Sequence, residues 1–235
     1  MSKLIAISNT QAYADTLCKC LNMPCEKNQH NIGYEILGAK IRFFPHEHIK
    51  GASEEYIKHE LEWYKSQDLN IKNHDGIENN TIWQSCATNE GSVNSNYGWC
   101  LFSKENYTQF DNAIKSVIND NMTKQAVMIY SRPNINQQWN DGIHANHDMI
   151  CTIYVSALLR DKKLNWHVHM RSNDIWYGLR NDLAWQQWVQ EQFVQKLNDL
   201  DVCCECGDII WFADSLHLYN RNYNSATKFI EECGY

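Results

Sequence analysis

Three segments of the chain carry apolar residues at the spacing of an α-helix. In residues 54–66, 104–119 and 183–200 these positions recur every three or four residues. Such a period gathers apolar side chains on one face of a helix, which then packs against a core. We therefore predict helices over these ranges, the second with Ser103 as its N-cap.

Two neighbouring segments have the features of β-strands. Residues 149–159 are a nearly continuous apolar run, residues 160–163 form a polar turn, and residues 164–171 alternate strictly between apolar and polar side chains. Alternation places successive side chains on opposite faces of a strand, so we predict a hairpin here and a further strand over residues 208–213. The polar face of the second strand is expected to hold Asn165, His167, His169 and Arg171.

Helices interspersed with hairpin-linked strands indicate a mixed α+β domain rather than a doubly wound parallel sheet. The 235 residues fit one large domain over residues 1–235, without an internal repeat or a linker rich in proline and glycine. Residues 72–81 and 132–148 have the polar composition that is typical of exposed loops.

Composition and charge narrow the possible functions. Hydrophobic residues make up 43% of the chain, which favours a globular protein, and the net charge of -7 argues against a broad nucleic-acid-binding surface. A small anionic ligand needs only a few local cations and stays possible. No apolar run approaches the roughly 20 residues that cross a bilayer, and the first residues do not resemble a signal peptide, so we expect a cytoplasmic protein.

The ten cysteines are interpreted as reduced thiols. Loose clusters at residues 18–25 and 203–206 lack the paired spacing of structural zinc sites, and no histidine pair comes with a convincing third ligand. We therefore predict no metal site, with zinc at the cluster formed by Cys203, Cys204 and Cys206 as the alternative.

Glu60 is a carboxylate on an apolar helix face. Ile57 and Tyr64, three residues before it and four residues after it, share its face, whereas Glu62 points away. A buried carboxylate is costly unless it is paired, hydrogen-bonded or protonated. Glu60 is therefore either a structural partner in an ion pair or cap, or a residue with a chemical role.

Several residues that could react with a ligand or bind it lie between Cys151 and Asp182. Cys151 alternates with apolar residues, which is typical of an inert core thiol, although a cation such as Arg171 would lower its pKa and make it a nucleophile. Arg171 and Ser172 together can bind an oxyanion. Asp182 suits the N-cap of a helix that begins at Leu183. The alternative interpretation is that Asp174, Asp182, His217 and Tyr219 are ordinary residues of turns or of the surface.

Seven segments in collinear order, from about residue 27 to residue 220, resemble the thymidylate synthase superfamily and, within it, the deoxycytidylate hydroxymethylase branch of T-even phages. They are EEYIKHELEWYKS, IW, VNSNYGW, MIYSRP, MICT, MRSNDIWYGLRNDLAW and SLHLY, which begin at residues 54, 82, 93, 128, 149, 170 and 215. The resemblance implies a thymidylate synthase-like fold with a central mixed β-sheet flanked by helices, and a homodimer formed through that sheet.

The resemblance also implies transfer of a one-carbon unit from 5,10-methylenetetrahydrofolate to C5 of a pyrimidine nucleotide. Cys151 matches the family's nucleophile, whose thiolate adds to C6, and Glu60 matches a buried glutamate that orders water and moves protons. Quenching the intermediate with water gives a hydroxymethyl group, and quenching with hydride from the folate gives a methyl group. Thr152, where methylating members have histidine, agrees with the hydroxymethylase branch.

The same match implies the remaining site residues. Arg171 and Ser172 match phosphate ligands, and His217 and Tyr219 match the pair that holds the sugar hydroxyl. Positions that bind the nucleotide are matched by Lys27 (across an alignment gap), Arg171, Ser172, Asn181, His217 and Tyr219. Positions that bind the folate are matched by Trp83, Asp174 and Gly178.

Asp182 bears on the choice of base, together with two departures from the family pattern. Uracil-specific members carry asparagine at this position, whereas a carboxyl group can accept from the amino group of cytosine and share a proton at N3, so Asp182 indicates dCMP. An arginine pair that the second subunit contributes to the phosphate site is replaced by Lys124 and Gln125, which alters the clamp. The last residues lack the apolar tail that closes over the substrate in methylating members.

The sequence therefore predicts a homodimeric enzyme that converts dCMP to 5-hydroxymethyl-dCMP for the modified DNA of a phage. The alternatives are the same chemistry on dUMP, methylation of dCMP or dUMP, and an idle homologue that only binds a nucleotide or a partner protein.

Overall fold

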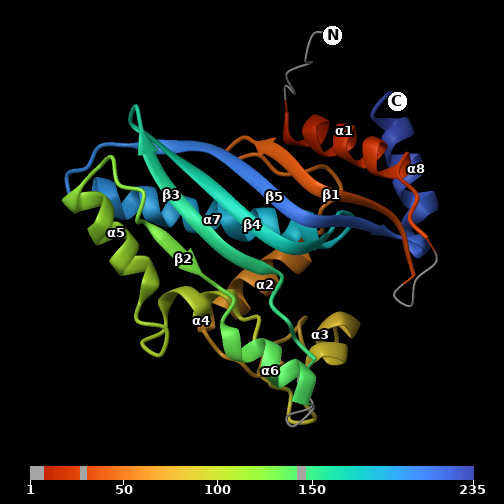
Figure 1. Cartoon of the computed structure of the whole chain (residues 1–235), viewed down its shortest axis with the longest axis horizontal. Coiled ribbons are helices and arrows are strands. Elements are labelled where there is room, and N and C mark those ends of the chain that lie inside the picture. Colours follow the sequence, from red (N-terminus) through yellow and green to blue (C-terminus); the bar gives the residue numbers. More distant parts are fainter. Residues whose placement is uncertain (1–7, 27–30, 142–146) are drawn as a thin grey trace. The chain divides into compact units, whose positions relative to one another are not determined.

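In the computed structural model, helices and strands of mixed α+β type fall into two compact units (Figure 1). The first unit combines residues 1–52 with residues 158–235, and the second comprises residues 53–157. Within the described part of the chain, no helix is long and apolar enough to cross a membrane. The residues that the structure describes are 8–26, 31–141 and 147–235.

Three long strands form the sheet of the first unit. β1 (Ile32–Phe43) runs antiparallel to β5 (Glu205–Tyr219), and β5 runs parallel to β4 (Lys163–Asp174). The parallel pairing brings the ends of β4 and β5 to the same edge of the sheet. Polar residues at these two strand ends therefore become neighbours.

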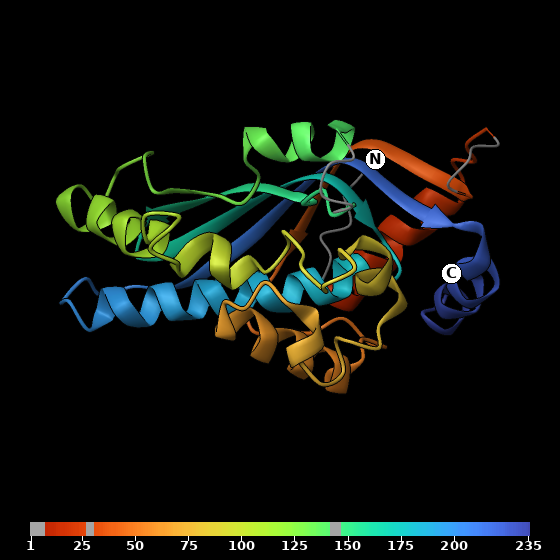
Figure 2. The same cartoon turned by 90° about the horizontal axis from the view of Figure 1, so that it is seen from below.

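A long helix covers one face of this sheet. Helix α7 (Gly178–Asn198) packs on β4 and β5, and Figure 2 shows it running along one side of both strands. The indole N–H of Trp166 donates to Gln186 Oε1 of the helix over 2.9 Å. The predicted apolar face of β4 is confirmed, because the buried side chains of this strand include Leu164, Trp166, Val168 and Met170.

Two further helices pack together in the first unit. α1 (Asn9–Leu21) contacts β1 and α8 (Tyr223–Glu232), and Figure 1 shows the two helices side by side. Tyr13 meets Phe229 edge to face, with ring centroids 5.4 Å apart. A 3₁₀ turn, Asn220–Asn222, joins the end of β5 to α8.

The second unit is mainly helical. α2 and α4 approach each other so closely that Gly98 has no room for a Cβ beside the carbonyl oxygen of Tyr64. Tyr64 stacks on Tyr97 with ring centroids 5.0 Å apart. The elements of this unit include α2 (Glu54–Ser66), a 3₁₀ turn (Ile71–Asn73), α3 (Thr81–Cys86), α4 (Tyr97–Phe102), α5 (Gln109–Asn119) and α6 (Pro133–Asp141).

One strand belongs to both units. β3 (Thr152–Arg160) begins in the second unit, where it pairs antiparallel with β2 (Val127–Ile129), and ends in the first. The strands consequently follow the order β1-β5-β4-β3-β2 in one mixed sheet. Both the mixed α+β class and the mixed sheet flanked by helices are confirmed.

The predicted elements differ from the observed ones mainly at their ends. α2 has the predicted bounds, whereas α7 begins at Gly178 rather than at residue 183. Ser103 does not cap α5, because its hydroxyl accepts from the N–H of Asn106 over 3.2 Å in a turn that precedes the helix. Residues 132–148 are not one loop, since α6 begins at Pro133, a residue that suits the first position of a helix.

Candidate active site

Cys151 lies in the second unit, in a bend directly before β3. The prediction that it forms part of the strand is therefore wrong, although the apolar positions after it do alternate between the faces of β3. The half-buried Sγ lies 3.9 Å from the carbonyl oxygen of Met149. A bend leaves the direction of the side chain less constrained than a strand, where each position is assigned to one face.

A buried carboxylate holds the loop in front of Cys151. Asp148 accepts hydrogen bonds from the backbone N–H groups of Asn94 (2.7 Å) and Ser95 (2.6 Å) and from the Ser95 hydroxyl (2.6 Å). Asn94 also accepts from Arg132 Nη2 over 2.6 Å. Hydrogen bonds to a carboxylate are stronger than neutral ones, so the loop is fixed close to the thiol. Sequence analysis did not single out Asp148.

Glu60 is buried, as the helical period predicts, with 6% of its surface exposed. Its Oε1 accepts from the hydroxyl of Tyr56 over 2.9 Å, and that hydroxyl accepts from the indole N–H of Trp83, also over 2.9 Å. Trp83 packs edge-on against Trp63, with ring centroids 4.8 Å apart. The structure thus joins two predicted site residues, the carboxylate Glu60 and the folate-matched Trp83, through one tyrosine.

Lys124 and Gln125 are exposed residues in front of β2. The backbone N–H of Gln125 donates to the hydroxyl of Thr123 over 3.1 Å. Their exposure leaves both side chains accessible to a second molecule. Lys27, which matches a nucleotide-binding position, lies outside the described residues.

In the first unit, the predicted phosphate and folate residues meet at the end of β4. Arg171, Ser172 and Asp174 are half-buried there. The parallel register places Ser172 beside Ser215 and Asp174 beside His217. Residues matched to phosphate, pterin and sugar therefore lie next to each other on two strands.

Asp174 organises the turn from β4 into α7. Its carboxylate accepts from the backbone N–H of Trp176 over 2.9 Å. Burial raises the pKa of Asp174, although backbone N–H donors and the imidazole of His217 favour the ionised form. Gly178 is the first residue of α7, and a Cβ there would lie 3.3 Å from the amide nitrogen of Asn173, so a larger residue would crowd this turn.

Asp182 lies inside α7, so it does not cap a helix that begins at Leu183. Its Oδ2 accepts from Nδ2 of Asn173 over 2.8 Å, and Oδ1 of Asn173 accepts from the indole N–H of Trp211 over 3.2 Å. Burial raises the pKa of Asp182 to about 7; the Asn173 hydrogen bond opposes this shift and Asp174 adds to it. Near neutral pH this carboxyl is present in both protonation states and can donate or accept.

His217 and Tyr219 lie at the end of β5. His217 is buried, and its ring meets that of Tyr219 edge-on with centroids 5.1 Å apart. Burial lowers the pKa of His217, against the opposing influence of the Asp174 carboxylate, so the ring is neutral at pH 7. The guanidinium of Arg221 lies 4.5 Å from the centroid of the Tyr219 ring. Asn181 is half-buried on α7.

Two residues beside His217 escaped the sequence analysis. Ser215 Oγ donates to Oε1 of Glu35 over 2.5 Å and lies 3.4 Å from Nδ1 of His217. Glu35 comes from β1, where the antiparallel register pairs it with His217. The only sequence signal was for Ser215, which opens the segment SLHLY.

The predicted residues thus form two sets, one in each unit. Across residues 8–26, 31–141 and 147–235, no group of histidine, cysteine, aspartate and glutamate side chains has the arrangement of a metal site. The set in the second unit comprises Cys151, Glu60, Trp83, Lys124 and Gln125. The set in the first unit comprises Arg171, Ser172, Asp174, Gly178, Asn181, Asp182, His217 and Tyr219.

Comparison with known proteins gives a consistent picture. The family model described as thymidylate synthase matches residues 26–233. The deoxycytidylate 5-hydroxymethyltransferases of Enterobacteria phages T4 and T2 are each 43% identical over 174 residues, which is 73% of this chain and 69% of those proteins. The thymidylate synthase of Buchnera aphidicola subsp. Baizongia pistaciae (strain Bp) is 26% identical over 180 residues, which is 74% of this chain and 63% of that protein.

Proposed function

The chain belongs to the thymidylate synthase family, and on this premise we propose that it transfers a one-carbon unit from 5,10-methylenetetrahydrofolate to C5 of dCMP. Water then adds to that carbon, and the product is 5-hydroxymethyl-dCMP. The similarity to deoxycytidylate 5-hydroxymethyltransferases of phages supports this reaction and a role in making modified phage DNA in the cytoplasm of the infected cell. The observation that carries the choice of base is the half-buried carboxyl of Asp182, which Asn173 holds through a hydrogen bond.

Asp182 and cytosine are complementary. The carboxyl group shares one proton with N3, and its other oxygen accepts from the exocyclic amino group. Uracil instead presents an N3–H donor and an O4 acceptor, so an ionised Asp182 would leave O4 facing a negative charge without a donor. A pKa of about 7 keeps the shared proton available near neutral pH, and the Asn173 amide fixes the plane of the carboxyl group.

Cys151 supplies the nucleophile. Its thiolate forms a bond to C6, the electron pair of the C5–C6 double bond moves to C5, and C5 bonds to the one-carbon unit, which the folate provides at the oxidation level of formaldehyde. C5 then loses its proton as the bond between the one-carbon unit and the folate nitrogen breaks, which leaves an exocyclic methylene. Water adds to that methylene carbon, and the thiolate leaves C6. The folate is released as tetrahydrofolate because no hydride is transferred.

Glu60 handles the water and its proton. The carboxylate accepts from Tyr56, which keeps one oxygen fixed while the other orders the attacking water and takes its proton. Trp83 is linked to the same tyrosine and offers a half-buried indole against which a pterin can pack. Asp174 offers a carboxyl acceptor for the N–H groups of a pterin, and Gly178 leaves space beside it, so these residues fit the folate.

The nucleotide's phosphate and sugar would be held by the first unit's residues. Arg171 supplies a guanidinium and Ser172 a hydroxyl to the phosphate, and His217 with Tyr219 binds the sugar hydroxyl. Lys27 would add a charge to the phosphate. We also propose that Asn181, Lys124 and Gln125 contact the substrate, since they match family positions that do so.

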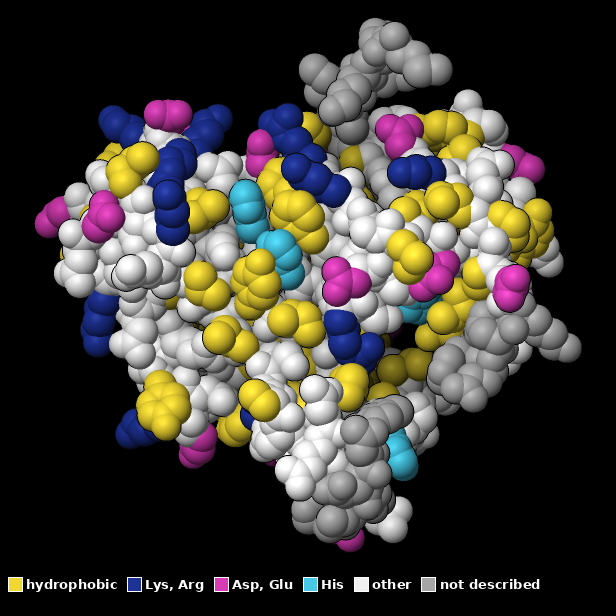
Figure 3. All heavy atoms as spheres, viewed as in Figure 1, with side chains coloured by type: hydrophobic (Ala, Val, Ile, Leu, Met, Phe, Trp, Pro, Cys, Tyr) yellow, Lys and Arg dark blue, Asp and Glu magenta, His cyan; other side chains and the backbone are white. Residues whose placement is uncertain are grey.

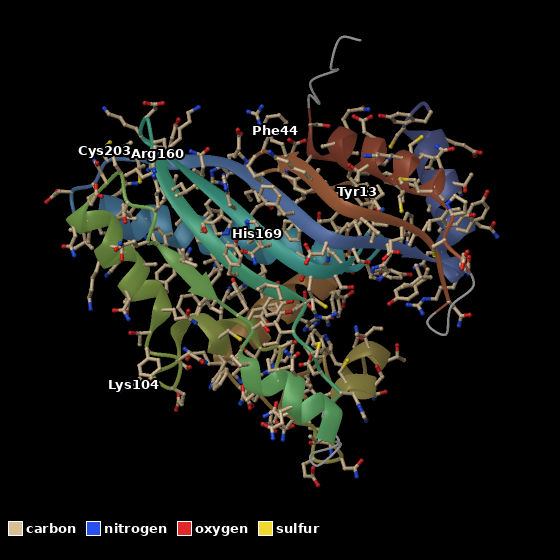
Figure 4. The ribbon with its side chains drawn as sticks, viewed as in Figure 1. Tyr13, Phe44, Lys104, Arg160, His169 and Cys203 are labelled. Carbon is tan, nitrogen blue, oxygen red and sulfur yellow. The ribbon has the colours of Figure 1, made fainter. Side chains whose placement is uncertain are left out.

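A homodimer would complete the phosphate site with Lys124 and Gln125 of a second copy. The face of the sheet opposite α7 supports dimerisation, because it mixes apolar and aromatic side chains with histidines, as Figure 3 shows over β4 and β5. His169 stacks on Phe212 with centroids 4.5 Å apart, and Figure 4 shows His169 on β4. Sedimentation velocity should give a dimer, and Phe212→Asp should give a monomer.

The decisive experiment is incubation of the purified protein with dCMP, formaldehyde and tetrahydrofolate. We expect a product about 30 mass units heavier, which is the CH2O increment of this chemistry. Turnover of dUMP without turnover of dCMP would overturn the base assignment. Formation of dihydrofolate, followed by absorbance, would indicate methylation, and no turnover of either nucleotide would indicate a homologue that only binds.

A further inference from the structure

We infer that Glu35 and Ser215 are positioning residues that hold the proton of the neutral His217 ring on Nδ1, so that Nε2 is a hydrogen-bond acceptor. An acceptor at this place favours a sugar substituent that carries a proton, such as a hydroxyl, over one that can only accept. The identity of the ligand rests on the proposed function. The position of the proton is a property of the protein alone, and it can be measured without any nucleotide.

The direction of one hydrogen bond carries the inference. The Ser215 hydroxyl has a single proton. It donates this proton in a hydrogen bond to Oε1 of the Glu35 carboxylate, 2.5 Å away. Towards Nδ1 of His217, 3.4 Å away, the same oxygen can then act only as an acceptor. Nδ1 therefore carries the hydrogen, and in a neutral ring Nε2 does not.

Strand positions, rather than loops, hold this arrangement. Glu35 is paired with His217 across β1 and β5, and Ser215 lies two residues before His217 on the same strand. Because side chains two residues apart share a face, the three groups stay in line whenever the sheet is formed. With 4% of its surface exposed, the histidine has little freedom to turn its ring.

The charges around His217 leave the ring neutral. Asp174, beside it on β4, and Glu35 favour the protonated ring, while burial and the nearby Arg171 disfavour it, and the balance lowers the pKa. A hydrogen bond between the ring and the backbone of Ser215 also favours the protonated ring. A neutral ring with hydrogen on Nδ1 can accept from a ligand at Nε2 but cannot donate there.

The proton position can be read by NMR on protein labelled with 15N at histidine. The His217→Gln variant identifies the His217 signals, and we expect the wild-type protein to give the pattern of a ring protonated at Nδ1 only. In Glu35→Leu, the freed Ser215 hydroxyl donates to Nδ1 and the hydrogen moves to Nε2. A wild-type ring protonated at Nε2, or no change in Glu35→Leu, would overturn the inference.

Two other variants separate positioning from folding. Glu35→Gln keeps an oxygen acceptor for Ser215 and should retain the wild-type pattern. Glu205→Leu removes an exposed carboxylate from the start of β5, and it should leave the His217 signals unchanged. If Glu35→Leu is too unstable to study, Ser215→Ala is the alternative, because it removes the acceptor oxygen at 3.4 Å and should also release the fixed Nδ1–H form.

Kinetics then test the consequence for the ligand. The wild-type enzyme should prefer dCMP over its 3′-deoxy-3′-fluoro analogue, whose fluorine has no proton to donate, by about tenfold in KM, the value of roughly one hydrogen bond. In Glu35→Leu, where Nε2 carries the hydrogen and faces the fluorine as a donor, this preference should fall to about twofold. A preserved tenfold preference would count against the inference. The expected NMR pattern together with no turnover of dCMP would instead count against the proposed function.

Discussion

Asn173 holds Asp182 through a hydrogen bond of 2.8 Å from Nδ2 to Oδ2, which ties the end of β4 to the first turns of α7. The orientation of the amide is defined, because its oxygen accepts from the indole N–H of Trp211. Asp182 therefore has a fixed donor on one oxygen. In the proposed site, the remaining lone pairs and the proton of this carboxyl would distinguish the bases.

Asp182→Asn should move the preference of the enzyme from dCMP towards dUMP. An amide whose orientation is held by the Asn173 donor accepts from N3–H and donates to O4 of uracil, whereas in that orientation it opposes cytosine acceptor to acceptor and donor to donor. We expect the ratio of kcat/KM for the two nucleotides to change by about 10- to 100-fold. Asp199→Asn, an exposed position at the end of the same helix, is the control. An unchanged ratio would mean that Asp182 does not contact the base.

The raised pKa of Asp182 should also affect stability. The carboxyl ionises near 3.8 in the unfolded chain and near 7 in the folded protein, so between these values the folded protein binds the extra proton. The stabilising contribution is therefore complete below pH 3.8 and is lost as the pH rises to about 7. Urea unfolding of wild type and Asp182→Asn at several pH values isolates this contribution. Parallel curves would contradict it.

Cys151→Ser should abolish formation of the hydroxymethylated product while nucleotide binding persists. A serine hydroxyl is a far weaker nucleophile at neutral pH, and we expect turnover to fall by more than about 1000-fold. Cys203→Ser changes an exposed thiol, labelled in Figure 4, and should leave turnover unaffected. Mass spectrometry of the product and calorimetric titration with dCMP are the two measurements. Substantial turnover in Cys151→Ser would exclude it as the nucleophile.

Gln125→Arg should tighten binding of the nucleotide phosphate in the proposed dimer. The exposed amide carries no charge, and an arginine at the same place offers a bidentate pair of donors to phosphate oxygens. We expect KM for dCMP to fall by about tenfold. Gln84→Arg, which adds the same charge at an exposed position of α3, should have no such effect. Equal changes in both variants would point to long-range attraction rather than a contact.

Arg180 should stabilise the first unit through its packing more than through its charge. Its Nη1 donates to the carbonyl oxygen of Gly51 over 3.2 Å, but Nε and Nη2 have no hydrogen-bond partner among the described residues. We expect Arg180→Ala to lower the free energy of unfolding by about 3 kcal/mol and Arg180→Met by less than about 1 kcal/mol. The rings around the guanidinium are Trp176, Tyr13 and Phe229, with centroids at 4.2, 4.7 and 5.0 Å.

Chemical denaturation of the two Arg180 variants measures this difference. A methionine keeps most of the apolar contact with the aromatic rings and removes the cost of the two unsatisfied groups. An alanine leaves a cavity. Similar losses in both variants would show that the charge, through its attraction to the rings, provides most of the stabilisation.

Periodicity predicted those features that depend on one local pattern. The bounds of α2, the burial of Glu60 and the two faces of β4 all follow from the spacing of apolar residues, and all are confirmed. The start of α7 was missed because the turn that leads into the helix is held by the Asp174 carboxylate of the preceding strand rather than by a residue at the expected cap.

Partners that are distant in sequence could not be predicted from a local pattern. Glu35 reaches Ser215 across 180 residues, and Asp148 reaches Asn94 across 54. Neither carboxylate belongs to a motif, since each is defined only by which strand or loop the fold places beside it. The bend at Cys151 was hidden for the opposite reason, because the apolar run around it continues the pattern of the strand.

The two hydrogen bonds that link Trp83 through Tyr56 to Glu60 run in the same direction from donor to acceptor. The indole gives its hydrogen to the phenol, and the phenol gives its hydrogen to the carboxylate. An indole does not release its hydrogen at physiological pH, so no proton can enter or leave this chain of hydrogen bonds at Trp83. The two hydrogen bonds can stabilise a negative charge on Glu60, but they cannot supply a proton to Glu60 or remove one from it. In the proposed reaction, the proton of the attacking water would therefore go to the other carboxylate oxygen, Oε2.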